Sequence, residues 1–139
     1  MAKKVLADTG FWIALLTKSD RHHEAALVLE DDLAVHHLLV PWPTLFEFVD
    51  TRLARNPADA VRLKDLLLRE GNELVDDTPY RDQSLQYTLN HQGHSYSLVD
   101  HILRSMMEDP KIRIDGFVGF NHNDFYDVCA RRNIEMLPD

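Results

Sequence analysis

Residues Val5–Leu16 read V-L-A-D-T-G-F-W-I-A-L-L, and this stretch decides the fold class. It begins within a short apolar run, Lys4–Ala7, which the turn-forming sequence D-T-G closes. Such a run is typical of a buried strand that ends in a turn. Apolar residues resume over Phe11–Leu16. A buried strand followed at once by a second apolar segment favours an α/β fold.

Strand and helix patterns alternate along the rest of the chain. The sequence predicts further strands over Leu38–Trp42, Glu73–Asp76, Gly116–Phe120 and Asn133–Leu137. It predicts helices over His22–Glu30, Thr44–Ala54, Pro57–Glu70, Arg81–Asn90, Ser97–Glu108 and Asp124–Arg132. Because strands that alternate with helices form βαβ units, we expect a mostly parallel sheet covered by helices.

Length and composition agree with a single globular domain. The 139 residues suit one hydrophobic core, so we expect one domain over residues 1–139. Apolar residues make up 45% of the chain and charged residues 27%, which excludes a disordered protein. The single cysteine, Cys129, excludes an internal disulfide and a cysteine-based zinc motif. Since no apolar run approaches the roughly 20 residues of a membrane span, we expect a cytoplasmic protein without membrane contact.

The charge balance is acidic. Lysine and arginine number 15 against 23 aspartates and glutamates, which gives a formal net charge of −8. A protein that holds nucleic acid by electrostatics alone would carry a basic face instead. The acids either form a solvated surface or converge in one place, where they would require a divalent metal ion. Their positions along the chain bear on that choice.

Four acids fall where predicted strands end or the next helices begin. Asp8 directly follows the first strand. In three further segments an acid stands three positions after an N-cap type residue: Thr44 and Glu47, Ser97 and Asp100, and Asn121 and Asp124. Ligand sites in open parallel sheets lie beyond the carboxyl ends of the strands. The four carboxylates would therefore meet at one edge of the sheet.

Each of these acids also has a purely structural interpretation. An acid three residues after Ser, Thr or Asn forms a capping-box pattern that stabilises a helix start. Asp100 has a possible ion-pair partner one helical turn away in Arg104, and Asp8 alone could be a turn residue. Together, however, the acids form an all-oxygen ligand set, which Mg²⁺ and Mn²⁺ prefer. Helix N-termini would help several such carboxylates stay ionised near one another.

Four segments resemble the motifs of PIN-domain proteins, in the order and at the spacing of that family. They are V-L-A-D-T-G-F-W-I-A-L-L at Val5–Leu16, T-L-F-E-F at Thr44–Phe48, S-L-V-D-H-I-L at Ser97–Leu103 and F-V-G-F-N-H-N-D-F at Phe117–Phe125. Each motif is degenerate, but the ordered set spans nearly all of the chain. The size of the chain also resembles the VapC-type toxins of bacterial and archaeal toxin–antitoxin pairs.

The resemblance implies a three-layer α/β/α fold with a short, mostly parallel central sheet. It further implies an endoribonuclease that hydrolyses RNA phosphodiester bonds with Mg²⁺ or Mn²⁺, as the toxin of a type II toxin–antitoxin pair. By motif match, Asp8, Glu47 and Asp100 would be catalytic metal ligands, with Asp124 as the fourth acid. The family also implies a homodimer and an antitoxin protein as partner. A catalytically weak or inactive PIN-like module that binds RNA or protein is the alternative.

Two positions depart from the family pattern. Gly119 stands where the family often has Thr or Ser, so a hydroxyl is missing there. The acid of the final turn can occupy the position of Asn121 or of Asp124, and here only the second is acidic. Asn121 would then support the site. Asp115 is another acid nearby, but it precedes its strand and should lie at the opposite edge of the sheet.

Further residues have supporting roles in this interpretation. Thr9 could bond a ligand carboxylate or a metal-bound water. Arg52, Arg55 and Arg104 are candidates to meet RNA phosphates, although a solvated or intramolecular role is expected first for each. A bound divalent ion reverses the local field, so a protein of this acidity can still accept RNA.

Other functions fit the sequence less well. The D-T-G triplet at 8–10 also occurs in aspartic proteases, but that class is β-rich and this chain reads as mostly helical. The eight histidines include no H-E-x-x-H zinc motif. His91, His94 and His101 are only loosely spaced, and the pair His22–His23 is expected at an exposed element end. Aromatic residues of the strands and helix starts could stack RNA bases, although core packing is expected first.

Overall fold

A five-stranded parallel sheet forms the centre of the computed structural model, which describes residues 1–49, 56–90 and 96–139. The strands are β1 (Lys4–Ala7), β2 (His37–Pro41), β3 (Glu73–Val75), β4 (Gly116–Val118) and β5 (Glu135–Leu137). Their order in the sheet is β3-β2-β1-β4-β5, and every neighbouring pair is parallel. β2 and β3, on one side of β1, come before β4 and β5, on the other side, along the chain. The sheet therefore has a topological switch point between β1 and β4.

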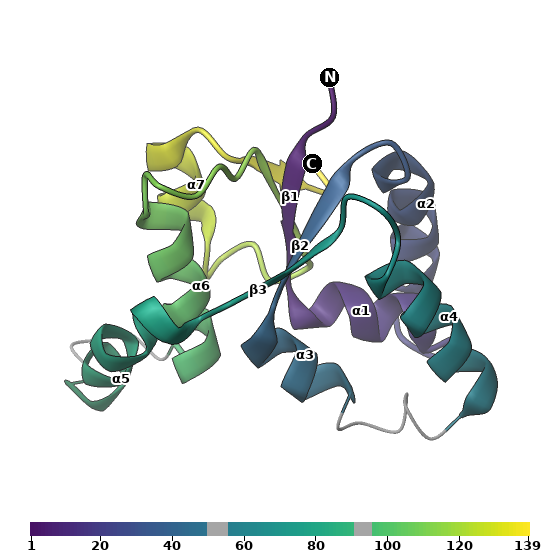
Figure 1. Cartoon of the computed structure of the whole chain (residues 1–139), viewed down its shortest axis with the longest axis horizontal. Helices are drawn as coiled ribbons and strands as arrows, with labels where there is room; N and C mark the ends of the chain where they lie inside the picture. The colour runs from purple at the N-terminus through teal and green to yellow at the C-terminus, as the bar shows by residue number, and fades with distance from the viewer. Residues whose placement is uncertain (50–55, 91–95) are drawn as a thin grey trace.

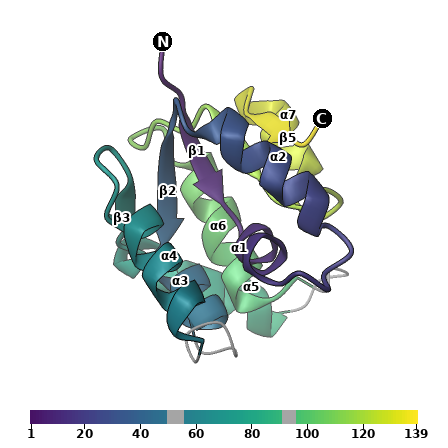
Figure 2. The same cartoon turned by 90° about the vertical axis from the view of Figure 1, so that its right-hand side faces the viewer.

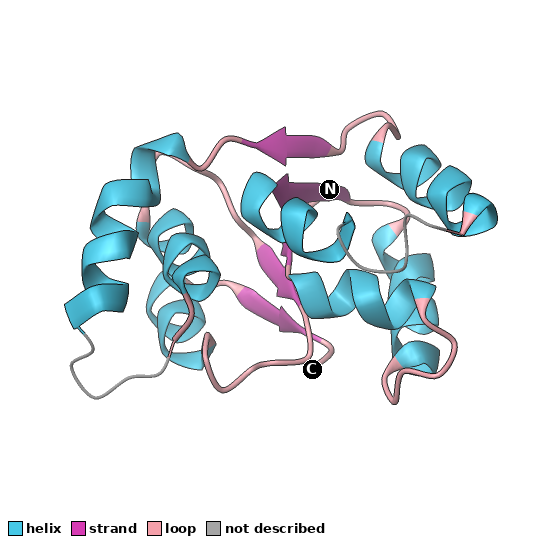
Figure 3. Cartoon of the chain, turned by 90° about the horizontal axis from the view of Figure 1, so that it is seen from below, coloured by secondary structure: helices cyan, strands magenta, loops and turns pink. Residues whose placement is uncertain are grey.

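Helices cover both faces of the sheet, which gives three layers (Figures 1 and 2). One face carries α1 (Thr9–Leu16), α2 (His23–Leu33) and α4 (Pro57–Leu67). The other carries α6 (Leu98–Glu108) and α7 (Tyr126–Arg132), with the short 3-10 helix η2 (Thr78–Tyr80) and α5 (Arg81–Asn90) beside α6. α3 (Trp42–Val49) follows directly on β2. Figure 3 shows the strands between helices on either side. The expected α/β/α fold is confirmed.

Alternate residues of β1 supply the two halves of the core. Val5 and Ala7 pack with side chains of α1 and α2, whereas Leu6 packs with side chains of α6 and α7. This division follows because successive side chains of a strand point to opposite faces of the sheet. On the α1 side, the rings of Trp12 and Phe48 stack with their centroids 5.3 Å apart. The stack holds α1 against α3, two helices that carry residues of the predicted acidic site.

Two helices, α3 and α7, begin two residues away from their predicted starts. α3 begins at Trp42, since Pro43 suits the first turn of a helix. Thr44 thus lies inside α3, and its Oγ1 donates to a backbone carbonyl one turn earlier (2.8 Å) instead of capping the helix. α7 begins at Tyr126, so the predicted start at Asp124 is wrong as well. Two of the three predicted capping boxes therefore do not form.

The opposite edge of the sheet holds the acid that the sequence excludes from the site. Asp115 lies just before β4, and its Oδ2 accepts a hydrogen bond from the Lys4 backbone N–H, at the start of β1, at 2.9 Å. Arg113 pairs with the same carboxylate. These contacts confirm that Asp115 lies at the amino-terminal edge of the strands.

The helices of this fold are short. The longest in the described residues, α2, α4 and α6, have 11 residues each. Across residues 1–49, 56–90 and 96–139, no helix combines the length and the apolar character that crossing a lipid bilayer requires.

Candidate active site

Asp8 lies at the switch point of the sheet, between the end of β1 and the start of α1. Its backbone N–H donates to the Val118 carbonyl of β4 at 3.0 Å. As the N-cap of α1, its Oδ1 accepts from the Thr9 N–H at 2.8 Å, and only 9% of the residue is exposed. Gly119 lies close behind it, because a Cβ on that glycine would be 3.0 Å from the Asp8 Cβ. The fold thus buries one carboxylate where α/β sheets bind their ligands.

The pKa of Asp8 is raised from 3.8 to about 6. Burial is the main cause, because the carboxylate loses the water that would stabilise its charge. The negative charges of Asp100, Glu47 and Asp124 raise this pKa further, whereas the hydrogen bond from the Thr9 N–H lowers it. Asp100, Glu47 and Asp124 therefore each lie within electrostatic reach of Asp8.

A side-chain hydrogen bond ties Glu47 to α1. Glu47 lies on the exposed side of α3, and its Oε1 accepts from the Thr9 Oγ1 at 2.5 Å. Thr9 is the first residue of α1, directly after Asp8. The bond matches the predicted contact of Thr9 with a carboxylate of the acidic set. It also couples the position of α3 to the residue that follows the buried acid.

Asp100 caps α6 and belongs to the acidic set as well. The Ser97 Oγ accepts from the Asp100 N–H at 3.1 Å, and the Asp100 Oδ2 accepts from the Ser97 N–H at 3.2 Å. This is the one predicted capping box that the structure confirms. Asp100 also raises the pKa of Asp8, so this member of the capping box lies within electrostatic reach of the buried acid.

Asp124 lies in the turn that precedes α7. Its Oδ2 accepts from the Asn121 Nδ2 at 2.7 Å, so the amide predicted to support the site does contact this acid. Its backbone carbonyl accepts from the Arg104 Nη1 at 2.7 Å. Two side chains, one in the same turn and one on α6, thus fix the position of Asp124 without a helix cap.

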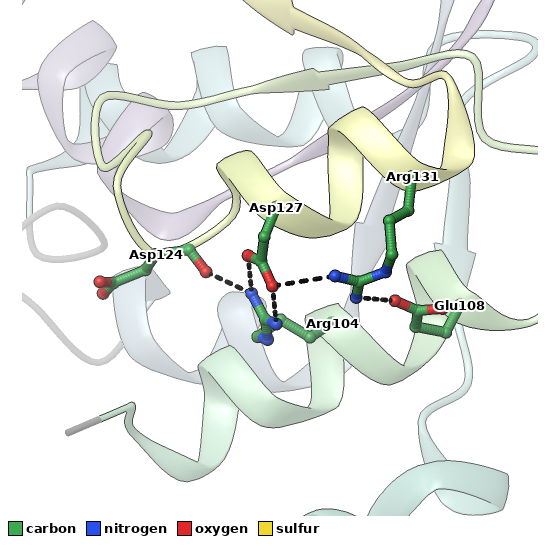
Figure 4. A network of polar contacts seen from close by, with 5 residues as sticks. All are labelled: Arg104, Glu108, Asp124, Asp127 and Arg131. Carbon is green, nitrogen blue, oxygen red and sulfur yellow. Dashed lines mark hydrogen bonds and ion pairs between the residues drawn. The ribbon is translucent and has the colours of Figure 1, made fainter. Parts of the chain in front are cut away.

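Arg104 forms the centre of a network between α6 and α7 (Figure 4). Its Nη1 and Nη2 donate to the two carboxylate oxygens of Asp127 at 2.7 and 2.6 Å. Arg131 joins Asp127 to Glu108 on α6. The hydrogen bond from Arg104 holds the pKa of Asp127 well below its usual range. The alternative in which Arg104 pairs with Asp100 is therefore wrong, because the guanidinium makes a bidentate pair with Asp127 on α7 instead.

Several sequence predictions fall on residues that the structure does not describe. The candidate RNA contacts Arg52 and Arg55 lie outside the described residues, as do His91 and His94. His101 is described, on α6, where its ring packs 5.8 Å from Tyr87 and 5.5 Å from Tyr96 between centroids. These contacts place His101 in an aromatic cluster.

The donor set of this site suits a hard divalent cation, since it consists of carboxylate oxygens alone. In the described part of the chain, no three His, Cys, Asp or Glu side chains stand close enough together to hold a metal ion as they are placed. Glu47 and Asp124 are instead held by Thr9 and Asn121. Ligation of one ion by the whole set would therefore require these side chains to exchange their hydrogen bonds for the metal.

Sequence reasoning missed a group of residues beside the acids. A cavity of about 590 Å³ opens at Asp8 and is lined in part by Arg21, His22 and Phe120. The prediction that His22 is exposed is wrong, because its ring is half-buried and stacks on Phe120. The two segments are far apart in the sequence, so no local pattern could have joined them.

The sheet order and the helical layers on both faces of the sheet form a PIN-like fold. The solved structure of Mycobacterium tuberculosis VapC20, described as a sarcin-ricin loop cleaving toxin, is similar to this chain with a TM-score of 0.71 at 20% sequence identity. The similarity covers 88% of this chain and 94% of that one. No protein-family model and no curated protein matches the sequence. The likeness establishes the fold that the sequence motifs imply.

Proposed function

We propose that this protein is a divalent-metal-dependent endoribonuclease and the toxin of a type II toxin–antitoxin pair. The observation that carries the proposal is the convergence of Glu47, Asp100 and Asp124 on the buried Asp8 at the switch point of the sheet. The likeness in fold to a toxin that cleaves RNA supports the same activity. RNA is then the substrate, and an antitoxin protein and a second copy of the chain are the proposed partners.

The four acids would hold Mg²⁺ or Mn²⁺ in this function. When bound, such an ion lowers the pKa of a water molecule and offsets charge on the scissile phosphate. The rest of the site positions the ligands. Thr9 holds Glu47 next to Asp8, and Asn121 holds the carboxylate of Asp124. The burial of Asp8 excludes water from one side of the site, which strengthens every electrostatic contact there.

A cleavage assay tests the proposal. Purified protein would be incubated with a mixture of structured RNAs in Mn²⁺, beside Asp8→Asn and Asp100→Asn variants prepared identically. We expect cleavage by the wild type only, together with unchanged circular dichroism of the Asp8→Asn variant. Equal activity in all three preparations would contradict the proposed site and indicate a contaminating nuclease.

A catalytically weak or inactive module that binds RNA or protein is the second candidate. It is favoured by the hydrogen bonds that hold Glu47 and Asp124 within the protein and by the absence, among the described residues, of a ready-made three-ligand group. Folded wild-type protein that binds RNA or a protein partner but cleaves no RNA in Mn²⁺ or Mg²⁺ would establish this candidate.

A further inference from the structure

The cavity beside Asp8 is built from two loops that meet over the carboxyl edge of the sheet. Residues 20–22 connect α1 to α2, and residues 120–123 follow β4. Asp8 and Gly10 complete the lining. Asp20 also lines the cavity, and its Oδ1 is occupied by a hydrogen bond from the His22 backbone N–H at 2.8 Å. Its volume of about 590 Å³ lies within the range of cavities that bind small organic ligands. The cavity is therefore large enough for one nucleotide and opens directly onto the central acid.

A flat aromatic surface forms part of this cavity. The rings of His22 and Phe120 are nearly parallel, with an interplanar angle of 3° and centroids 4.3 Å apart. Phe120 also packs against the core on the α1 side of the sheet, which fixes the orientation of the pair. Parallel aromatic rings with a free edge or face are surfaces on which nucleobases stack. Both rings line the cavity, so the pair presents aromatic surface there, beside Asp8.

The polar groups of the cavity suit the remaining parts of a nucleotide. Arg21 is exposed and donates from Nε to the His22 Nε2 at 3.0 Å, and it forms no ion pair with any described residue. Its guanidinium can therefore accept a phosphate as partner. Asn121 and Asn123 line the other side. Their amides can donate to and accept from a base edge or a ribose hydroxyl.

Gly10 keeps the cavity wide. It is exposed on the first turn of α1, and a Cβ built there would meet no other heavy atom within 4 Å. A side chain at this position would thus enter open space without disturbing the packing of the protein. The glycine offers a way to fill the cavity while the fold is retained.

We propose that this cavity binds one unpaired ribonucleotide next to the scissile phosphate, with its base against His22 and Phe120 and a phosphate on Arg21. The inference rests on the proposed function and names the part of the substrate that the site recognises. The base must be unpaired, because a base within a duplex stacks on its neighbours and cannot enter a cavity. An RNA loop or single strand, rather than a duplex, is therefore the substrate.

Binding without metal tests the cavity apart from catalysis. A fluorescein-labelled 12-nucleotide RNA of randomised sequence would be titrated with protein in EDTA, and its anisotropy recorded. We expect His22→Ala and Arg21→Gln each to weaken binding about tenfold, and His22→Tyr to restore it through stacking. Arg21→Gln should also lower the slope of log Kd against log salt by about 0.7. Arg132→Gln, which removes an exposed cation outside the cavity, serves as the matched control and should bind as the wild type does.

Filling the cavity gives an independent test. We expect Gly10→Leu to weaken RNA binding about tenfold while its melting temperature stays at or above that of the wild type, since leucine is the better helix former. A duplex of the same length should bind no better to the wild type than to Gly10→Leu. Wild-type protein that binds no RNA, or cavity variants that bind single strands as Arg132→Gln does, would overturn the proposal.

The cleavage assay separates this inference from the proposed function. If the wild type cleaves RNA and the cavity variants bind RNA as tightly as the wild type does, the nucleotide subsite is contradicted and the nuclease activity is supported. If RNA binding depends on Arg21 and His22 but the protein cleaves no RNA, the nucleotide subsite is supported and the nuclease activity is contradicted.

Discussion

Arg104 and Asp127 join α6 to α7 through two parallel hydrogen bonds, and the same guanidinium holds the backbone carbonyl of Asp124. α6 also carries Asp100. One side chain therefore sets the distance between two acids of the candidate site that belong to different elements. Arg104 is a positioning residue in this arrangement, although the sequence suggested an RNA contact for it.

We expect Arg104→Gln to lower RNA cleavage roughly tenfold, because the turn that carries Asp124 loses its anchor. The free energy of unfolding should fall by about 1–2 kcal/mol, a modest value since the Asp127 side chain is 45% exposed. The pKa of Asp127 is held below its usual range, so this contribution is full above about pH 4 and is lost as the pH falls further. Chemical denaturation at pH 7 and pH 3 measures the loss of stability and its pH dependence, and the cleavage assay measures the loss of activity.

Arg113→Gln is the matched control for that variant. It removes an exposed ion pair with Asp115 at the opposite edge of the sheet. We expect a change of about 0.5 kcal/mol or less and unaltered cleavage. Equal loss of cleavage in both arginine variants would contradict a positioning role of Arg104.

Asp8→Asn should stabilise the metal-free protein at neutral pH. The folded-state pKa of Asp8 is raised to about 6, so the stability linked to its proton is present below about pH 4 and is lost as the pH rises through 6. The asparagine variant has no such proton to lose, so at pH 8 its free energy of unfolding should exceed that of the wild type by about 2–3 kcal/mol at most. Thermal melting between pH 4 and pH 8 in EDTA records the difference. Mn²⁺ should then raise the melting temperature of the wild type and not that of the variant.

Gly119→Ala should impair the site through Asp8. A Cβ at this position would be 3.0 Å from the Asp8 Cβ and 3.2 Å from the Phe117 ring, so the buried carboxylate must shift. We expect cleavage to fall roughly tenfold or more. Gly119→Ser should cleave RNA no faster than Gly119→Ala, although serine supplies the hydroxyl that the PIN-domain pattern often has at this position. Gly116→Ala is the control, because its Cβ would meet its nearest neighbour at an ordinary 3.5 Å.

Thr9→Val should release Glu47 from α1. The substitution keeps the shape of the side chain and removes the hydroxyl that donates to Glu47. We expect Mn²⁺ affinity, measured by calorimetry, to fall several-fold, with roughly the effect of losing an outer-shell partner of a metal ligand. Thr9→Ser should restore the affinity. Equal affinities of the valine variant and the wild type would show that Glu47 acts independently of Thr9.

Local patterns predicted most of the fold because its three central strands, β1, β2 and β4, are buried on both faces. β1 has the predicted bounds, Lys4–Ala7, since the turn residues that follow it leave no other end for the strand. The start of α6 was equally predictable, because the capping box of Ser97 and Asp100 is a local signal. The same pattern at Thr44–Glu47 and at Asn121–Asp124 forms no capping box, so this local signal alone does not decide where a helix begins.

The rest depends on contacts between distant segments. The turn before α7 is shaped by Arg104, which lies on another helix, and nothing near Asp124 in the sequence reports that bond. The stack of His22 on Phe120 likewise joins two loops that are far apart in the sequence. Such pairings arise only when the sheet brings its carboxyl ends together, so a single sequence contains no direct signal for them.

The middle strand of the sheet is also the first to be synthesised. β1 pairs with β2 on one side, but its other neighbour, β4, leaves the ribosome only after α6. Until then one edge of β1 has no partner, the apolar side of α6 lacks its contacts with β4 and α7, and Asp124 has not yet joined the other acids. Assembly of the candidate active site is therefore a late event in the folding of the nascent chain, and it should depend on release of residues 116–139.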